Sequence, residues 1–365
     1  MMLAGRLTKA RWLDHRARDA WAQGRYAHAI WRATRAVELA EQRPHPKQLP
    51  KRLQALSTLG GLHYELGDYA AAETVSRQAV TIAEQAPPGA ARDRLLAEAL
   101  TCLGDLCRRQ ARYDEAEAQL QRALGLVDAA SEARLQRAGV LNALGITYKD
   151  AGRFQAAEDC YQTALATIQQ LLGPDDPALA SLYHNLAGLA YARGHHAQAE
   201  PLARRAIQLR ERALGPTHPT VAADVAVLGA ILAAQGHHQP AEALFRRALA
   251  SFEHRYGPDH YEVAVNLNNL AALFQARGEW VDAERCYRRA LAIKQRTVGA
   301  AHPEVATLWN NLGVLHRQQG NYSQAEACYR AALGIYQAAL ASSHPTVLAC
   351  RENYQRLLAE QASTP

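Results

Sequence analysis

Long strand-forming runs are missing from this chain of 365 residues, and aromatic residues make up only 7% of it. Sheet-based folds draw on runs of Val, Ile, Thr and Tyr, so their absence argues against a β-rich architecture. Alanine and arginine dominate instead, and hydrophobic residues account for 48% of the chain, which allows a buried core. The composition therefore favours an all-α fold and argues against general disorder.

An apolar stretch long enough to cross a membrane is also missing, and no hydrophobic signal segment follows the N-terminus. We therefore expect no membrane partner and a cytoplasmic location. Residues 1–35 are rich in Arg and poor in acidic residues, as a mitochondrial targeting segment would be, but they also fit a first copy of the repeat described below. Mitochondrial targeting is kept as an alternative.

Paired cysteine motifs are absent as well. The six cysteines are Cys102, Cys107, Cys160, Cys286, Cys328 and Cys350, and none stands in a C-x-x-C pair. Cys286 and Cys328 lie beside an aromatic residue on the apolar stripe of a predicted helix, as small buried residues do. We expect six free thiols and a reducing compartment.

Lysine is scarce, since only five of the 41 basic residues are Lys. The formal net charge of +6 and the sequence pI near 9.0 therefore come almost entirely from arginine. A mild basic excess favours acidic partners, which leaves an acidic peptide and a nucleic acid as candidates.

The motifs of nucleotide-binding loops, zinc proteases and serine hydrolases are not found in the chain. We therefore predict a protein that is not an enzyme and needs no cofactor. Two histidine pairs, in GHHAQAE (194–200) and GHHQPAE (236–242), are the remaining candidates for metal binding. The four imidazoles belong to His195, His196, His237 and His238, and such a set could hold Zn or Ni. No Cys or carboxylate joins them in sequence, so we predict that they pack or face solvent and bind no metal.

A repeat with a period of about 42 residues dominates the sequence: residues 302–333 nearly restate residues 260–291. Each copy has an anchor leucine, and successive anchors are 41 to 44 residues apart. The anchors are Leu59, Leu103, Leu144, Leu186, Leu228, Leu270 and Leu312, and a degenerate first copy has Arg16 in the same place. Repetition at a fixed period is the signature of a solenoid, so we take the copies as the units of the fold.

The columns of the repeat predict a helix–turn–helix in every copy. A small residue follows the anchor and lets two helices approach closely, and a glycine or alanine eight residues past the anchor ends the first helix. A ring stands ten residues past the anchor, and alanine fills the places thirteen and twenty residues past it. The rings are Tyr26, Tyr69, Tyr113, Phe154, His196, His238, Trp280 and Tyr322.

We predict one domain, residues 1–365, made of eight helix pairs and a C-terminal capping helix over residues 345–361. The copies span residues 10–43, 53–86, 97–130, 138–173, 180–215, 222–257, 264–299 and 306–341. The segment 351–361 matches only a first helix, which is what a solenoid needs to cover its exposed end.

This pattern resembles the tetratricopeptide repeat (TPR), whose signature Trp309, Leu312, Gly313, Ala325 and Tyr329 match directly. The 42-residue period and the G-P-x-H-P-x-V-A linkers resemble the kinesin light chain type in particular. The resemblance implies an all-α, right-handed α-solenoid whose first helices line a concave groove. It also implies binding of a protein or peptide.

The first helices carry a row of asparagines one or two residues before the anchor. The row is Asn142, Asn185, Asn268, Asn269, Asn310 and Asn311. An Asn amide both donates and accepts hydrogen bonds, so the row can pair with the backbone of an extended peptide. Alternatively, these side chains bond one another or tie adjacent helices.

The rest of the predicted groove is partly basic and partly apolar. Its wall carries Tyr64, Arg108, Arg109, Lys149, Tyr191 and Arg317, and copy six contributes the small apolar residues Val227 and Ala230. We predict a scaffold or adaptor that binds an acidic peptide or partner with an apolar anchor. One alternative is a regulatory or sensor module of a signalling system. The other is nucleic-acid binding through the arginine excess, which the asparagine row and the few aromatics disfavour.

Overall fold

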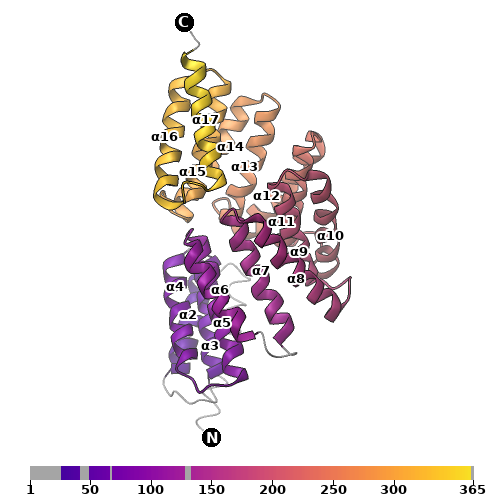
Figure 1. Cartoon of the computed structure of the whole chain (residues 1–365), viewed down its shortest axis with the longest axis vertical. Helices are drawn as coiled ribbons and strands as arrows, with labels where there is room; N and C mark the ends of the chain where they lie inside the picture. The colour runs from indigo at the N-terminus through magenta and orange to yellow at the C-terminus, as the bar shows by residue number, and fades with distance from the viewer. Residues whose placement is uncertain (1–25, 42–48, 66–67, 128–132, 363–365) are drawn as a thin grey trace. The chain divides into compact units, whose positions relative to one another are not determined.

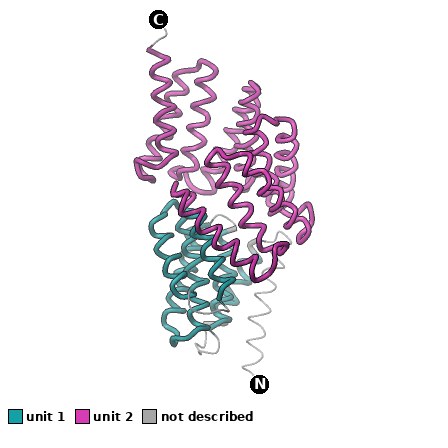
Figure 2. The backbone as a smooth tube through the Cα atoms, turned by 45° about the vertical axis from the view of Figure 1, so that its right-hand side comes forward, with its two compact units in different colours: residues 1–147 teal, residues 148–365 magenta. Residues whose placement is uncertain are grey.

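The computed structural model describes residues 26–41, 49–65, 68–127 and 133–362, and every regular element within these ranges is an α-helix (Figure 1). The predicted first helix of copy one lies outside the described residues. Two compact units divide the chain between Thr147 and Tyr148 (Figure 2), and each is described by itself. The single continuous solenoid stays a prediction.

The helices alternate between the two roles expected from the repeat. First helices are α3 (Leu49–Glu65), α5 (Ala90–Arg109), α7 (Arg134–Asp150), α9 (Leu179–Ala192), α11 (Pro219–Ala234), α13 (Tyr261–Ala276) and α15 (Pro303–Gln318). Second helices are α2 (Tyr26–Glu41), α4 (Tyr69–Glu84), α6 (Tyr113–Val127), α8 (Phe154–Leu172), α10 (His196–Leu214), α12 (His238–Tyr256), α14 (Trp280–Thr297) and α16 (Tyr322–Ala339). The predicted capping helix is α17 (Pro345–Ala362).

Helix pairs are the packing unit. In the first unit α3 packs on α4 and α5 on α6; in the second unit α9 packs on α10, α11 on α12, α13 on α14 and α15 on α16. Successive first helices of the second unit also touch, and α15 contacts α17. The structure thus confirms the predicted all-α array of helix pairs. The pairs stack because one pair alone cannot bury its apolar face. No helix in the described ranges is long and apolar enough to span a bilayer.

Small side chains hold the two helices of a pair together. The alanine thirteen residues past the anchor is completely buried in every copy; these are Ala29, Ala72, Ala116, Ala157, Ala199, Ala241, Ala283 and Ala325. A Cβ added to Gly313 would lie 2.7 Å from a ring carbon of Tyr329, and one added to Gly229 would lie 2.9 Å from the ring of Phe245. The aromatic ring of the second helix therefore occupies the space that the glycine leaves open.

The turn between the helices explains the glycine column. Gly236 ends the first helix of copy six with a φ of 84°, a left-handed conformation in which a side chain is strained. Copy three has Ala111 at the same place with a φ of 60°, and it is the one residue other than glycine with a positive φ in the described ranges. Every ring of the predicted column is then the first residue of a second helix.

Histidines start several of the first helices. The Nδ1 atoms of His218 and His302 accept the backbone N–H of Thr220 and Glu304, at 3.3 and 3.2 Å, and a proline follows each histidine in the first turn. The imidazole therefore acts as an N-cap, the role usually taken by Ser, Thr, Asp or Asn. Helix α9 differs, because it begins at Leu179, two residues after Pro177, and its N-cap residue Ala178 offers no side-chain hydrogen bond.

All six cysteines are free, as predicted. Cys107, Cys286, Cys328 and Cys350 are buried. Burial raises the pKa of the Cys350 thiol to about 11, so that thiol stays protonated at neutral pH. These residues fill space in the core.

Candidate functional site

Copy six presents an apolar surface on its first helix. Asp224 is the only charged residue of α11, and its side chain is fully buried, 2.7 Å from Nδ1 of His184 and 3.1 Å from Nε of Arg210. Its charge is therefore compensated inside the protein and does not reach the surface. Val227 and Ala230 are partly buried against the surrounding core, as expected for the floor of a groove.

A pocket of about 200 Å³ opens between α11 and α13. Its walls are Ala230, Ala233, Ala234, Phe245, Ala272, Leu273 and Ala276, and its polar residues are Tyr191, His238 and Asn269. Three of the predicted groove residues, Tyr191, Ala230 and Asn269, therefore meet in one place. Val227 does not line this pocket, and Phe245 and His238 were not predicted to belong to it.

The polar residues of this pocket differ in their surroundings. The Tyr191 side chain is 39% exposed, and its ring centroid is 5.4 Å from that of His196. Partial burial raises the pKa of the Tyr191 hydroxyl, which keeps it neutral and able to donate. Nδ1 of His238 is buried and makes no hydrogen bond within the protein. Nδ1 of His196, the equivalent ring of copy five, is also buried and makes no hydrogen bond within the protein.

The asparagines of copies seven and eight bond one another. Nδ2 of Asn353 donates to Oδ1 of Asn310 at 3.2 Å, and Nδ2 of Asn310 lies 3.4 Å from Oδ1 of Asn311. Nδ2 of Asn311 in turn donates to Oδ1 of Asn268 at 2.9 Å. The alternative interpretation of the row, that its members bond one another or tie adjacent helices, therefore holds for Asn268, Asn310 and Asn311, which Asn353 of the capping helix joins.

The remaining asparagines do not belong to that chain of bonds. Asn269 lines the pocket, Asn185 is half-buried on α9, and Asn142 is half-buried on α7 in the first unit. Contact of any of them with a bound peptide stays a prediction.

The predicted basic wall is largely neutralised from within. Asp105 accepts from Nε and Nη2 of Arg108 at 2.9 and 2.5 Å, and Nε of Arg109 donates to the Tyr64 hydroxyl at 2.6 Å. Burial by itself raises the pKa of Asp105, but the charges of both arginines outweigh it and hold that pKa below its usual range. Burial also raises the pKa of Tyr64. Both guanidiniums of this cluster are therefore engaged by groups of the protein itself.

The other predicted cations are engaged in the second unit. Nζ of Lys149 lies 3.7 Å from Oδ1 of Asp150. Arg317 donates to Glu360 of the capping helix, and only 14% of the Arg317 side chain is exposed. Arg317 therefore holds α17 against α15, and its guanidinium faces a carboxylate of the protein itself. The expectation of an open basic wall missed these acidic partners.

The structure places the two histidine pairs at the starts of α10 and α12. Within the described ranges, nowhere do three or more His, Cys, Asp or Glu side chains lie close enough together to hold a metal ion. His195 and His237 precede α10 and α12 at their N-caps, without a hydrogen bond from the side chain to the helix. His196 packs against Tyr191 and His238 lines the pocket, in the places that other copies give to an aromatic ring.

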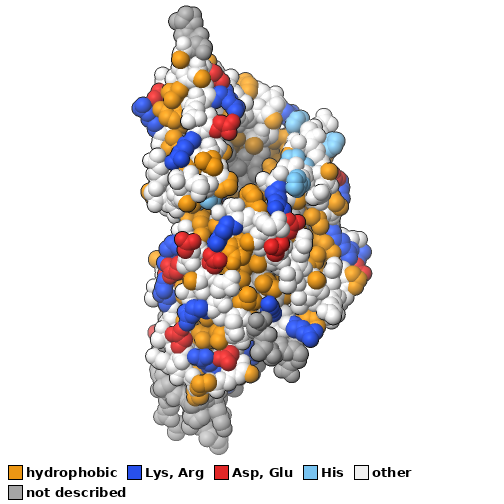
Figure 3. Space-filling model, viewed as in Figure 1, with side chains coloured by type: hydrophobic (Ala, Val, Ile, Leu, Met, Phe, Trp, Pro, Cys, Tyr) orange, Lys and Arg blue, Asp and Glu red, His pale blue; other side chains and the backbone are white. Residues whose placement is uncertain are grey.

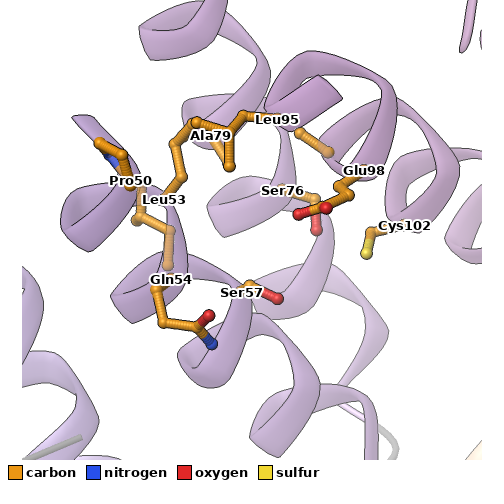
Figure 4. A pocket seen from close by; sticks show the side chains of 11 residues that line it. Pro50, Leu53, Gln54, Ser57, Ser76, Ala79, Leu95, Glu98 and Cys102 are labelled. Carbon is orange, nitrogen blue, oxygen red and sulfur yellow. The ribbon is translucent and has the colours of Figure 1, made fainter. Parts of the chain in front are cut away.

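A smaller pocket in the first unit was not predicted from the sequence. It has a volume of about 70 Å³ and lies among α3, α4 and α5 (Figure 4). Leu53, Ser76, Glu98 and Cys102 are among the residues that line it. The residues of α3 and α5 that line this pocket precede the anchor leucine of their copy. Most of the α11 and α13 residues that line the larger pocket follow the anchor of theirs.

Seven segments match the model of the tetratricopeptide repeat family: 51–129, 95–167, 136–212, 196–254, 222–296, 262–338 and 304–362. Together they cover most of the chain. It belongs to the tetratricopeptide repeat family. Six of the seven matches begin in step with the period of about 42 residues, and the one that begins at residue 196 does not.

Solved TPR-like structures share the fold. The crystal structure of BtubC (BKLC) from P. vanneervenii is 28% identical, covering 62% of this chain and 91% of its own, with a TM-score of 0.51. A Rap protein complexed with competence and sporulation factor is 12% identical over 100% and 99% of the two chains, with a TM-score of 0.61. The Rap conjugation gene regulator of plasmid pLS20, in complex with the Phr* peptide, is 14% identical over 93% and 99%, with a TM-score of 0.64. None of the curated proteins matches this TPR chain.

Proposed function

We propose that this TPR protein is a non-enzymatic scaffold or adaptor that binds an extended, acidic segment of a peptide or partner protein. The segment lies on the first helices of copies five to eight, in the concave groove, and places one large apolar side chain in the pocket between α11 and α13. The observation that carries the proposal is this pocket, because alanines leave it open and polar groups stand at its edge.

The asparagines supply backbone contacts for such a segment. Asn269 lines the pocket, and Asn311 lies one copy further along the same face. An Asn amide has two N–H donors, so the bond that Asn311 gives to Asn268 leaves it a second donor for a peptide carbonyl. The backbone of an extended peptide carries N–H and C=O groups that a neighbouring strand would pair in a sheet, and the Asn amides can pair with them instead.

The proposal that the ligand is acidic rests on the basic excess of this protein. The formal net charge of the chain is +6, and nearly all of its basic residues are arginines. Basic and acidic side chains are otherwise interspersed over the face shown in Figure 3. A mixed surface of this kind favours a weakly acidic peptide over a nucleic acid, which needs a continuous basic track.

The fold shared with the Rap proteins supports a peptide ligand, since one of those structures is a complex with competence and sporulation factor and another with the Phr* peptide. It also favours the alternative of a regulatory or sensor module within a signalling system. A scaffold and a sensor module would both bind the peptide on the first-helix face, so one binding experiment tests the binding surface of either.

An array of acidic peptides, each with one large apolar residue, provides the test. The strongest binder is then measured against variants of both faces. Asn269→Ala should weaken binding by about 1 kcal/mol, the scale of a lost hydrogen bond that leaves a partner unpaired.

Matched controls lie on the second helices. Arg246 and Arg288 are 66% and 60% exposed and pair only with a glutamate four residues earlier on their own helices. Arg246→Glu and Arg288→Glu should leave peptide binding unchanged. Loss of binding in these variants but not in Asn269→Ala would place the ligand on the other face and refute the proposal.

A further inference from the structure

The second helix of copy two lacks the large side chain that most copies place seventeen residues past the anchor. Copies three, four, six, seven and eight bury a leucine or an aromatic ring at this place, namely Leu120, Tyr161, Phe245, Tyr287 and Tyr329. The residue of copy two is Ser76. A much smaller side chain thus lies where the helix pair usually packs a large one.

Copy two keeps the glycine that leaves room for this large side chain. A Cβ added to Gly104 in copy three would lie 2.7 Å from Cγ of Leu120, so the leucine occupies that room. A Cβ added to Gly60 in copy two would lie 3.5 Å from Oγ of Ser76, an ordinary contact distance. Ser76 lines the pocket of about 70 Å³ among α3, α4 and α5, so this pocket lies where copy two lacks a large side chain.

Ser76 brings a polar group into the pocket without a partner for it. The residue is only 8% exposed, and its hydroxyl makes no hydrogen bond with the residues that the structure describes. A hydroxyl both donates and accepts hydrogen bonds, and a buried one without a partner is costly. A ligand that enters the pocket and bonds this hydroxyl therefore gains from doing so.

Glu98 of α5 is the only charged residue that lines this pocket. No ion pair or hydrogen bond joins its carboxylate to the described part of the chain. Figure 4 shows the oxygen-bearing ends of Ser57, Ser76 and Glu98 on one side of the pocket. Pro50 and Leu53 lie on the other side in the same view. The pocket therefore combines an acidic, oxygen-rich wall with an apolar one.

We propose that this pocket binds a primary ammonium group on a short alkyl stem, as a lysine side chain or a small free amine carries. An ammonium group has three N–H donors, and Ser57, Ser76 and Glu98 offer an acceptor from each of three helices. The alkyl stem packs against Leu53 and Ala79, which are buried at the pocket. The inference goes beyond the proposed function, whose pocket lies in the second unit.

The charge of the pocket argues against other small ligands. The carboxylate of Glu98 repels anions, and no basic side chain lines the pocket to attract them. Enclosure of the thiol and the carboxylates of Asp105 and Glu98 raise the pKa of Cys102 to about 11, so this thiol is neutral. A divalent metal ion would need more carboxylates than the one that lines this pocket.

The size of the pocket limits the ligand to a short stem. An apolar cavity of about 150 Å³ is known to bind benzene, and this pocket has about half of that volume. About three or four non-hydrogen atoms therefore fit, which is the size of propylammonium or of the end of a lysine side chain.

Titrations with three small probes of similar size test the proposal: propylammonium chloride, 1-propanol and sodium propionate, all at one constant ionic strength. The full chain is labelled on alanine methyl groups, so that Ala79 and Ala99, which line the pocket, report binding by NMR. We expect propylammonium to shift both methyl signals with a Kd on the order of 10 mM. Binding of 1-propanol should be about tenfold weaker, because it lacks the charge, and propionate should not bind.

Two substitutions of Ser76 separate the space of the pocket from its hydroxyl. Ser76→Leu gives copy two the residue of copy three and should abolish propylammonium binding by filling the pocket. Ser76→Ala keeps the pocket open and removes only the hydroxyl, so binding should weaken about fivefold. Since Ser76→Ala adds no atoms to the core, its result stands even if Ser76→Leu fails to fold.

Glu98→Gln removes the charge and keeps a polar side chain of the same shape. It should weaken propylammonium binding about tenfold and leave 1-propanol binding unchanged. Asp114→Asn is the matched control, because Asp114 is exposed on α6 in the same unit and does not line the pocket. This control should bind propylammonium within about twofold of the wild type. Equal affinities of propylammonium and 1-propanol, or unchanged binding in Glu98→Gln, would overturn the ammonium assignment.

A blocked lysine, Nα-acetyl-lysine methylamide, distinguishes the two sources of the ammonium group. Affinity within about threefold of propylammonium, or tighter, assigns the pocket to a lysine side chain of a partner. Weaker binding than that assigns it to a small free amine. Failure of both amines to shift the Ala79 and Ala99 methyl signals would refute the proposal.

Discussion

The guanidinium of Arg289 donates from Nη2 to the carbonyl oxygen of Pro258, 2.9 Å away and 31 residues earlier in the chain. The same bond joins Arg247 to Pro216 at 2.9 Å and Arg205 to Pro174 at 2.8 Å. Each of these arginines also reaches a carboxylate, those of Glu253, Glu211 and Asp175 respectively. One arginine of each of these three second helices, α10, α12 and α14, therefore fastens the linker that precedes its own copy.

Replacing Arg289 with alanine removes the bond to the Pro258 carbonyl and the pair with Glu253. We expect the free energy of unfolding to fall by about 1 kcal/mol, the usual scale for one such bond, in chemical denaturation. Amide exchange should accelerate around Gly257 and Pro258. The adjacent Arg288 is the control, because it is 60% exposed and pairs only with Glu284 on its own helix, so Arg288→Ala should cost less than about 0.5 kcal/mol.

Ala111 holds a left-handed backbone conformation that the other copies give to glycine. A non-glycine residue there costs about 1–2 kcal/mol, because its Cβ approaches the following carbonyl oxygen. Ala111→Gly should therefore stabilise the first unit by about 1 kcal/mol. Ala118, exposed in the middle of α6, is the matched control: Ala118→Gly should destabilise by about 1 kcal/mol. Destabilisation by both changes would contradict the strain at Ala111.

Glu304 makes the stability of the last copies depend on pH in the acidic range. Burial raises its pKa, but the ammonium of Lys294 and the hydrogen bonds from Lys294 and Tyr261 outweigh burial and lower the pKa to about 2. A carboxyl with a depressed folded-state pKa stabilises fully above its unfolded pKa of about 4.5. That contribution is lost as the pH falls from about 4.5 to about 2.

Denaturation of wild type and Glu304→Gln between neutral pH and pH about 2 checks this, since the two curves should converge in acid as the wild-type carboxyl becomes protonated. Glu352→Gln is the control for the loss of one negative charge, because Glu352 is 72% exposed beside Arg356. Curves for wild type and Glu304→Gln that stay parallel over this range would refute the role of Glu304.

Ala241 is completely buried where α12 meets α11. Ala241→Leu should destabilise the array by about 1–3 kcal/mol, since added methyl groups overpack a close helix contact. Damage in a repeat array is local, so hydrogen exchange should rise in copies five to seven and stay unchanged in α16 and α17. Equal acceleration at both ends of the second unit would contradict this packing model.

The repeat columns determined the fold because each column acts within one copy. The columns predicted that Ala241 and Gly229 are small because two helices meet there, and both residues are buried at that contact. Gly236 was predicted to end the first helix of copy six, and it has the positive φ that such an end favours. These interactions join residues three to about sixteen places apart, so a pattern along the chain is enough to predict them.

The site depended on contacts that no column reveals. Asn311 bonds Asn268 and Arg317 bonds Glu360, each pair 43 residues apart, so which side chains neutralise one another follows from the way copies stack. The pairing of Arg108 with Asp105 was within reach of the sequence, because helix residues three apart are neighbours. Copy six could be read as apolar, but only tertiary packing brings Tyr191, His238 and Asn269 from three successive copies to the edge of one pocket. A periodic sequence specifies the shape of each helix pair, whereas the space between pairs depends on how several copies approach one another at once.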